Sequence, residues 1–106
     1  MDYNKLKTFI TVVDRGSITS AAKSLLRSQS AISQQIQQLE WELDIRLLER
    51  KSGTFYLSPE GQEIYKYGKT YLEKIDEGLS EVKNAFTSLE GSIRLGFSII
   101  IGASSI

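Results

Sequence analysis

The stretch of sequence that decides the fold is residues 17–43, SITSAAKSLLRSQSAISQQIQQLEWEL. It predicts two short helices joined at Leu26-Arg27-Ser28. In the second of them, apolar residues recur at steps of four, three and four from Ile32 to Leu43. This spacing places them on one stripe of an α-helix and predicts that the stripe is buried. The opposite stripe consists of Ser30, Gln34, Gln37 and Trp41.

The exposed face of this helix has the chemistry of a DNA-reading surface. Ser28 precedes the helix as an N-cap, so the next residues project from turns where amides, hydroxyls and free backbone N–H groups lie together. Such groups carry donors and acceptors without net charge, as readout of major-groove base edges requires, whereas a solvated face is usually rich in Lys and Glu. An ordinary amphipathic helix with a glutamine-rich exterior is the alternative. The residues predicted to read bases are Gln29, Ser30, Ser33, Gln34 and Gln37.

Two further helices are predicted before this one. The first spans roughly residues 4–14, and Gly16 supplies its stop. Ser17 then caps a second short helix, in which Ala21 and Ala22 allow another helix to approach closely. With the third helix ending near Asp44, these short elements have enough apolar faces to close one core. The apolar stripe of the first helix is Leu6, Phe9, Ile10 and Val13.

Residues 45–58 have the pattern of a β-hairpin. The stretches 46–50 and 54–58 flank Lys51-Ser52-Gly53, which predicts a turn at Ser52-Gly53. Three helices followed by a hairpin predict a mainly α fold, a winged helix-turn-helix over residues 1–58. Arg50 and Lys51 are the natural phosphate contacts in this arrangement. The predicted contacts to the DNA backbone and from the wing are Ser17, Thr19, Arg27, Arg50, Lys51, Ser52 and Thr54.

A long helix is predicted over residues 59–90, opened by Ser58-Pro59-Glu60 with serine as cap and proline at the first helical position. Apolar residues recur along it at alternating steps of three and four, as in a coiled coil. About 31 helical residues extend roughly 46 Å, which is longer than a small domain can cover. We therefore expect a homodimer through this helix, the alternative being a helix packed on its own domain. The predicted dimer interface is Tyr65, Leu72, Ile75, Leu79, Val82 and Phe86.

Two glycines within this helix and one after it bear on its course. Gly68 and Gly78 lower helix propensity and mark either a close approach or a bend. Gly91 is expected to end the helix, because residues 92–97 and 99–101 follow the pattern of a buried β-strand. Residues 91–106 are therefore predicted to be the truncated start of a C-terminal domain.

Composition bounds the function. The chain of 106 residues has 41% hydrophobic residues, enough for one small core, and has neither cysteine nor histidine. The commonest general base and metal ligand are therefore missing, and we expect no enzyme, no metal and no cofactor. The carboxylates Glu40, Glu42 and Asp44 are expected to form a solvated helix end. No leader or membrane-spanning pattern is found, so we expect a cytoplasmic protein that does not enter a membrane.

Charge gives weak support for a nucleic-acid partner. The net charge of the whole chain is zero. Residues 1–58 carry eight Lys and Arg against six Asp and Glu, whereas residues 59–106 carry five against seven. The positive half is thus the half with the helix pair, although a strongly basic domain would show a much larger excess.

Over residues 2 to about 97 the sequence resembles the N-terminal part of the bacterial LysR-type transcriptional regulators. Helices, wing, long helix and the Gly-x-Ile-Arg-Leu-Gly segment at 91–96 appear in family order. The matching segments are Leu6-Lys7-Thr8-Phe9, Gly16 to Ala22, Ser28-Gln29, Ala31 to Ile36, Leu39-Glu40, Leu43, Arg46 to Arg50, Leu57-Ser58 and Glu60-Gly61.

The resemblance implies sequence-specific binding of double-stranded DNA, a dimer on a dyad-symmetric operator, and transcription regulation. It also implies a tetramer as a further option for the full-length protein, and a small-molecule effector that acts only through a C-terminal domain absent from this chain. Three positions depart from the family pattern. Ser30 replaces a usual proline, Gly53-Thr54 stand where an arginine is common, and Arg27 replaces an apolar turn residue.

A second class of function remains open from the sequence. Trp41 lies on the exposed stripe of the third helix, so the chain could be a dimeric helical adaptor that binds protein through this side chain. Salt-sensitive binding to duplex DNA distinguishes the two classes. An enzyme is the least favoured reading, because no nucleophile–base constellation, metal-ligand spacing or phosphate-binding loop is found.

Overall fold

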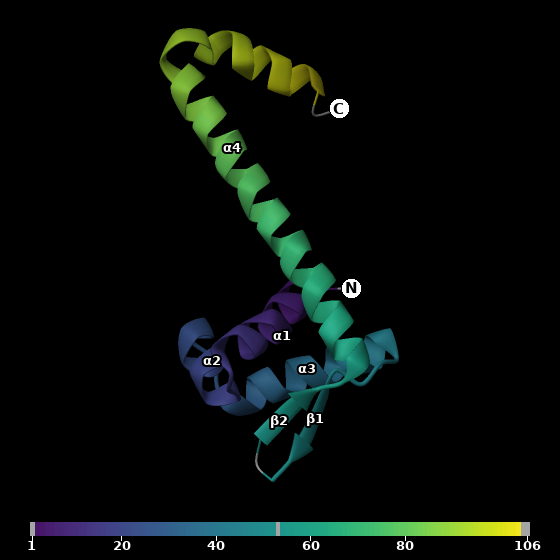
Figure 1. Ribbon diagram of the computed structural model, residues 1–106. Coiled ribbons are helices and arrows are strands. Elements are labelled where there is room, and N and C mark those ends of the chain that lie inside the picture. Colours follow the sequence, from purple (N-terminus) through teal and green to yellow (C-terminus); the bar gives the residue numbers. More distant parts are fainter. Residues whose placement is uncertain (1, 53, 105–106) are drawn as a thin grey trace. The chain divides into compact units, whose positions relative to one another are not determined.

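The computed structural model describes the backbone of residues 2–52 and 54–104 and the side chains of residues 2–52 and 54–87. Along the chain the elements are α1 (Tyr3–Arg15), α2 (Ile18–Leu25), α3 (Gln29–Leu43), β1 (Leu48–Lys51), β2 (Thr54–Leu57) and α4 (Pro59–Ser104) (Figure 1). Contacts divide the chain after Leu72 into two units. The first unit holds the three short helices, the hairpin and the start of α4.

Local signals set the ends of the short helices. The Asp2 carboxylate accepts the Asn4 N–H at 2.8 Å. The predicted caps are confirmed, because the Ser17 hydroxyl accepts the Ser20 N–H at 3.0 Å and the Ser28 hydroxyl accepts the Ala31 N–H at 3.1 Å. Gly16 ends α1 with φ +78°, a conformation that costs glycine little.

The three short helices enclose one core, as predicted. Phe9 on α1, Ala21 on α2 and Ile32 on α3 are completely buried. The alanines of α2 leave room for the neighbouring helices because they add only a methyl group each. The other buried apolar residues are Leu6, Ile10, Val12, Ala22, Ile36, Leu39, Leu47, Leu48 and Leu72.

The hairpin is antiparallel and joins the third helix through a carboxylate. Its register pairs Leu48 with Leu57 and Lys51 with Thr54, which confirms the predicted turn, although Gly53 itself lies outside the described residues. The Glu40 carboxylate on α3 accepts the backbone N–H groups of Leu47 at 2.7 Å and Leu48 at 3.2 Å.

The acidic end of α3 is therefore not merely solvated, and that expectation is wrong for two of its three carboxylates. Glu40 anchors the start of the hairpin, because its carboxylate accepts two backbone N–H groups there. Glu42 forms an ion pair with Lys5 of α1. Only Asp44 of the three is left as an exposed helix end, with its backbone at φ +55°.

The start of α4 is fixed against the hairpin by one serine. The Ser58 hydroxyl donates to the Arg46 carbonyl oxygen and accepts the Gly61 N–H at 2.8 Å, which confirms Ser58 as the cap of α4. Ser58 is 2% exposed. A Cβ atom at Gly61 would overlap the carbonyl oxygen of Leu47, so only glycine fits this close approach.

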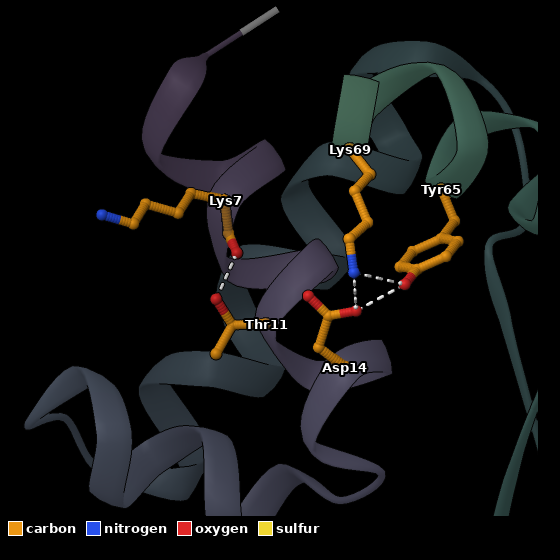
Figure 2. A network of polar contacts seen from close by, with 5 residues as sticks. All are labelled: Lys7, Thr11, Asp14, Tyr65 and Lys69. Atoms are coloured by element: carbon orange, nitrogen blue, oxygen red, sulfur yellow. Dashed lines mark hydrogen bonds and ion pairs between the residues drawn. The ribbon is translucent and has the colours of Figure 1, made fainter. Parts of the chain in front are cut away.

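The part of α4 around Tyr65, Gly68 and Lys69 packs on α1. Gly68 lies against it so closely that a Cβ there would be 2.9 Å from Leu6 Cδ1, so of the two options predicted for this glycine the structure shows a close approach. Figure 2 shows a polar network at the same junction. Tyr65 donates its hydroxyl proton to Asp14, and the Lys69 ammonium donates to Asp14 Oδ1 at 2.9 Å and to the Tyr65 oxygen at 3.2 Å.

This packing changes the assignment of two predicted interface residues. Leu72 is only 9% exposed and belongs to the core of its own domain, and Tyr65 is partly buried against that core. The heptad spacing identified an apolar stripe correctly but not what covers it, and here α1 covers its first turns. The dimer prediction therefore narrows to the residues after Leu72.

In the second unit, α4 carries the remainder of the apolar stripe. Ile75, Leu79 and Val82 are 38%, 53% and 50% exposed, and Phe86 is 44% exposed. The predicted end of the helix at Gly91 and the strand over residues 92–101 are wrong, because α4 continues to Ser104. A lone strand leaves its backbone N–H and C=O groups unpaired, whereas a helix pairs them internally without any neighbour.

Candidate nucleic-acid interface

A polar hollow of about 520 Å³ lies where α2, α3 and the hairpin meet. Its walls are the start of α2, the first turns of α3 and the tip of the wing. Its lining includes Ser17, the N-cap of α2, and Gln29, the first residue of α3, and the N-terminus of a helix favours an anionic partner. Seven residues predicted from sequence as DNA contacts line it together: Ser17, Thr19, Gln29, Ser33, Arg50, Ser52 and Thr54.

Arg50 connects the two halves of this hollow. Its Nη2 donates a hydrogen bond to the Ser33 hydroxyl at 3.3 Å, so a wing side chain contacts the first turns of α3. The Arg50 side chain is otherwise exposed. A guanidinium carries five N–H donors, so several of them still face solvent and are available to a phosphate.

The residues predicted to read bases lie along α3. Gln29, Ser30, Gln34 and Gln37 are exposed, and Ser33 is half-buried beside Arg50. The Ser30 hydroxyl lies 3.4 Å from that of Ser28, so this residue, where the family usually has proline, extends the polar group at the helix cap. The first turns of α3 therefore present hydroxyl and amide groups without any charged side chain.

The remaining predicted backbone contacts lie around this surface. Arg27 is exposed in the turn between α2 and α3, which Leu26 closes with φ +56°. Lys51 is exposed at the end of β1, opposite Thr54. Neither residue is among those that line the hollow, whereas Arg50 is.

Sequence reasoning missed Arg46. It is exposed at the approach to β1 and lines two further hollows along α3, one with Arg50 and Gln37 and the other with Gln34 and Trp41. A signal was present, since Arg46 and Arg50 stand four residues apart in the basic segment before the turn.

Among the residues whose side chains are described, no three metal-ligating side chains gather in a cluster. No helix in the described part of the chain is long and apolar enough to cross a membrane.

The fold defines a winged helix-turn-helix protein. Residues 3–62 match the family described as "Bacterial regulatory helix-turn-helix protein, lysR family", and the chain belongs to this family. Among curated relatives it is 40% identical over 104 residues to the HTH-type transcriptional regulator BenM of Acinetobacter baylyi, covering 96% of this chain and 34% of BenM. It is 35% identical over 106 residues to the nitrogen assimilation regulatory protein nac of Escherichia coli, covering 100% of this chain and 35% of nac.

The chain thus spans about a third of the length of these relatives. Among solved structures it is similar to the BenM DNA-binding domain in complex with catB site 1 DNA, at 39% identity and a TM-score of 0.77, covering 83% of this chain and 95% of that one. It is also similar to the CbnR DNA-binding domain in complex with DNA, at 33% identity and a TM-score of 0.72, covering 80% and 98%.

Proposed function

We propose that this chain binds double-stranded DNA sequence-specifically, as the DNA-binding part of a LysR-type transcriptional regulator. The observation that carries the proposal is the single polar hollow in which α2, α3 and the wing bring seven predicted contact residues together. The similarity to two DNA-binding domains solved with DNA supports it.

In the proposed complex α3 enters the major groove. Gln29, Ser33 and Gln34 on its first turns read base edges, since each side chain can donate and accept hydrogen bonds. Ser17 and Thr19 at the start of α2, with Arg50 and Lys51 on the wing, hold phosphates and fix the register. Binding alone performs this function, and no catalytic step is part of it.

The proposal includes a homodimer. Ile75, Leu79 and Val82 leave an apolar stripe in water on a small protein, and a second copy of the same helix is the simplest cover. The two α3 helices, one from each copy, then bind the two halves of one dyad-symmetric DNA site. In the full-length protein a tetramer is a further option, and a small-molecule effector acts through a C-terminal domain that residues 91–106 would begin. Because bacterial DNA lies in the cytoplasm, the function implies that location.

Selection of bound duplexes from a random pool, followed by mobility shifts at several salt concentrations, tests this function. We expect a dyad-symmetric preferred sequence and an affinity that falls steeply as salt rises, because phosphate contacts release counterions. A pool without enrichment and an absence of any shift at low salt would overturn the proposal. The adaptor hypothesis would then gain support from the exposed Trp41.

A further inference from the structure

The polar hollow at the start of α3 continues along the whole helix. It shares Ser33 and Arg50 with a second hollow of about 280 Å³ between α3 and β1. The second hollow shares Gln37 and Arg46 with a third, broad depression of about 860 Å³ at the end of α3. One connected surface therefore extends from the start of α2 to the last turn of α3.

Trp41 stands at the far end of this surface. It is 89% exposed, and it continues the outward stripe four residues after Gln37 and eleven after Ser30. Eleven residues of α-helix advance roughly 16 Å. An indole that is so fully exposed keeps a large apolar face in water, and its N–H is a donor that suits an acceptor on a partner.

We propose that Trp41 and Arg46 contact the sugar–phosphate backbone of the same duplex, beyond the bases that the first turns of α3 read. This inference rests on the proposed function. N-terminal residues of a recognition helix contact base edges, and the major groove is about 12 Å wide, so the last turn of α3 lies at the rim of the groove. There the Arg46 guanidinium meets a phosphate, and the indole packs on deoxyribose.

The charged side chains around the third depression favour a phosphate partner, except for one exposed carboxylate. Of the acidic side chains near it, the Glu40 carboxylate accepts two backbone N–H groups and Glu42 pairs with Lys5. Asp44 alone lines the depression as an exposed carboxylate, so it opposes a phosphate there. Its removal should therefore improve binding, which is an effect that a purely structural role would not produce.

Trp41 is the single tryptophan of the chain, so its intrinsic fluorescence reports on this site without an added label. The intact chain would be titrated with two duplexes that contain the selected sequence, one with long flanks and one cut back to the bases that are read. With the long duplex we expect a blue-shifted emission and protection of Trp41 from acrylamide. With the short duplex, binding should persist while this protection is largely lost.

Three variants complete the test. Trp41→Ala and Arg46→Ala should each weaken binding of the long duplex about three- to ten-fold and of the short duplex much less. Arg46→Ala should also lower the salt slope by about one, while Trp41→Ala leaves it unchanged. Asp44→Asn should tighten binding of the long duplex, and asparagine tolerates the left-handed backbone at this position. Lys23→Ala, which removes an exposed cation on α2, is the matched control.

The outcomes separate this inference from the function on which it rests. If the long duplex binds and acrylamide still reaches Trp41 as in the free chain, the inference is overturned while the function stands. The surface around Trp41 would then stay accessible to solvent in the DNA complex, as a site for a protein partner requires. Equal losses on both duplexes for the Trp41 and Arg46 variants would also overturn it. If neither duplex binds, the proposed function and this inference fail together.

Discussion

Arg50 on the wing and Ser33 on α3 are joined by a hydrogen bond of 3.3 Å from the Arg50 Nη2 to the Ser33 hydroxyl. The two residues are 17 positions apart in sequence, and we propose different DNA contacts for them, phosphate for Arg50 and bases for Ser33. Their contact links the wing to the helix for which we propose base readout. A substitution at either residue therefore affects the geometry of the other, and double variants are expected to be non-additive.

Base readout should be concentrated in Gln29 and Gln34, which are exposed on the first turns of α3, and in Ser33. Alanine at each position should cost roughly 1 to 3 kcal/mol of binding free energy on the preferred site and much less on random DNA, because base contacts carry the discrimination. Fluorescence anisotropy with both duplexes gives the two losses. An equal loss on both would remove the residue from base readout.

Phosphate contacts should behave in the opposite way. Arg50→Ala and Lys51→Ala remove exposed cations of the wing, so they should weaken all duplexes alike and lower the salt slope by about one each. Lys23→Ala, on the exposed face of α2, should leave the slope unchanged. If either wing variant changed only which sequence is preferred, the phosphate assignment would be wrong.

Dimerisation should depend on the exposed stripe of α4. Leu79→Lys would bring two lysines together near the two-fold axis without partners, so it should abolish the dimer and lower DNA affinity through lost bivalency. Sedimentation at micromolar concentration measures the assembly. Glu77→Lys, exposed on the opposite side of the helix, is the control. A wild-type chain that sediments as a monomer would contradict the proposed dimer.

The Asp14 network should make stability depend on pH. Partial burial raises the pKa of Asp14, but hydrogen bonds from Tyr65 and Lys69 and the charge of Lys69 outweigh this and hold that pKa below its ordinary value. A carboxyl whose pKa is depressed on folding stabilises the protein above its unfolded pKa, and the contribution is lost as pH falls through the folded pKa. The side chain is 38% exposed, so solvent screening limits the contribution to about 0.5 kcal/mol.

Urea unfolding of Asp14→Asn and the parent chain measures this effect. The variant should be less stable at pH 7, and the difference should vanish at pH values below the folded pKa of Asp14. Tyr65→Phe removes one donor of the network and should cost no more than about 0.5 kcal/mol at pH 7, because solvent screens this exposed bond. A stability difference that is independent of pH would show that Asp14 acts through packing instead of charge.

Two glycines of α4 should respond to alanine with opposite signs. Gly61→Ala should destabilise the chain by about 1 to 3 kcal/mol, because its Cβ would overlap the Leu47 carbonyl oxygen. Nothing lies within 4 Å of a Cβ at Gly78, so Gly78→Ala should add up to about 1 kcal/mol of helix propensity. Urea unfolding for the first variant and far-ultraviolet circular dichroism for the second give the signs.

The sequence was sufficient for the helices and the hairpin because their signals are local. The Ser17, Ser28 and Ser58 hydroxyls accept N–H groups three residues onward, so a short window of sequence contains the whole interaction. The same locality explains why the hollow beside α3 could be anticipated. Its residues lie at the starts of α2 and α3 and at the hairpin tip, and the order of the elements brings these together.

The predictions that were wrong concern residues whose contact partners lie far away in the sequence. Heptad spacing shows that one stripe of α4 is apolar, but it does not distinguish α1 from a second copy as the cover of Tyr65 and Leu72. The isoleucines after Gly91 favour a β-strand. A strand also needs a second strand to pair with its backbone, and residue preferences do not show whether one is present. The ion pairing of Glu42 with Lys5 likewise depends on how α1 crosses α3.

The buried hydroxyl of Ser58 has a mechanical consequence. The Ser58 hydroxyl donates to the chain just before β1 and accepts the amide of the first turn of α4. We therefore expect a displacement of the wing to shift the beginning of that helix. A duplex that displaced the hairpin would strain the hydrogen bond from the Gly61 amide to the Ser58 hydroxyl. The shape of the DNA under the wing would then alter the geometry of the first turn of α4. Hydrogen exchange at the Gly61 amide would then change when DNA is bound, although no part of α4 need touch the duplex.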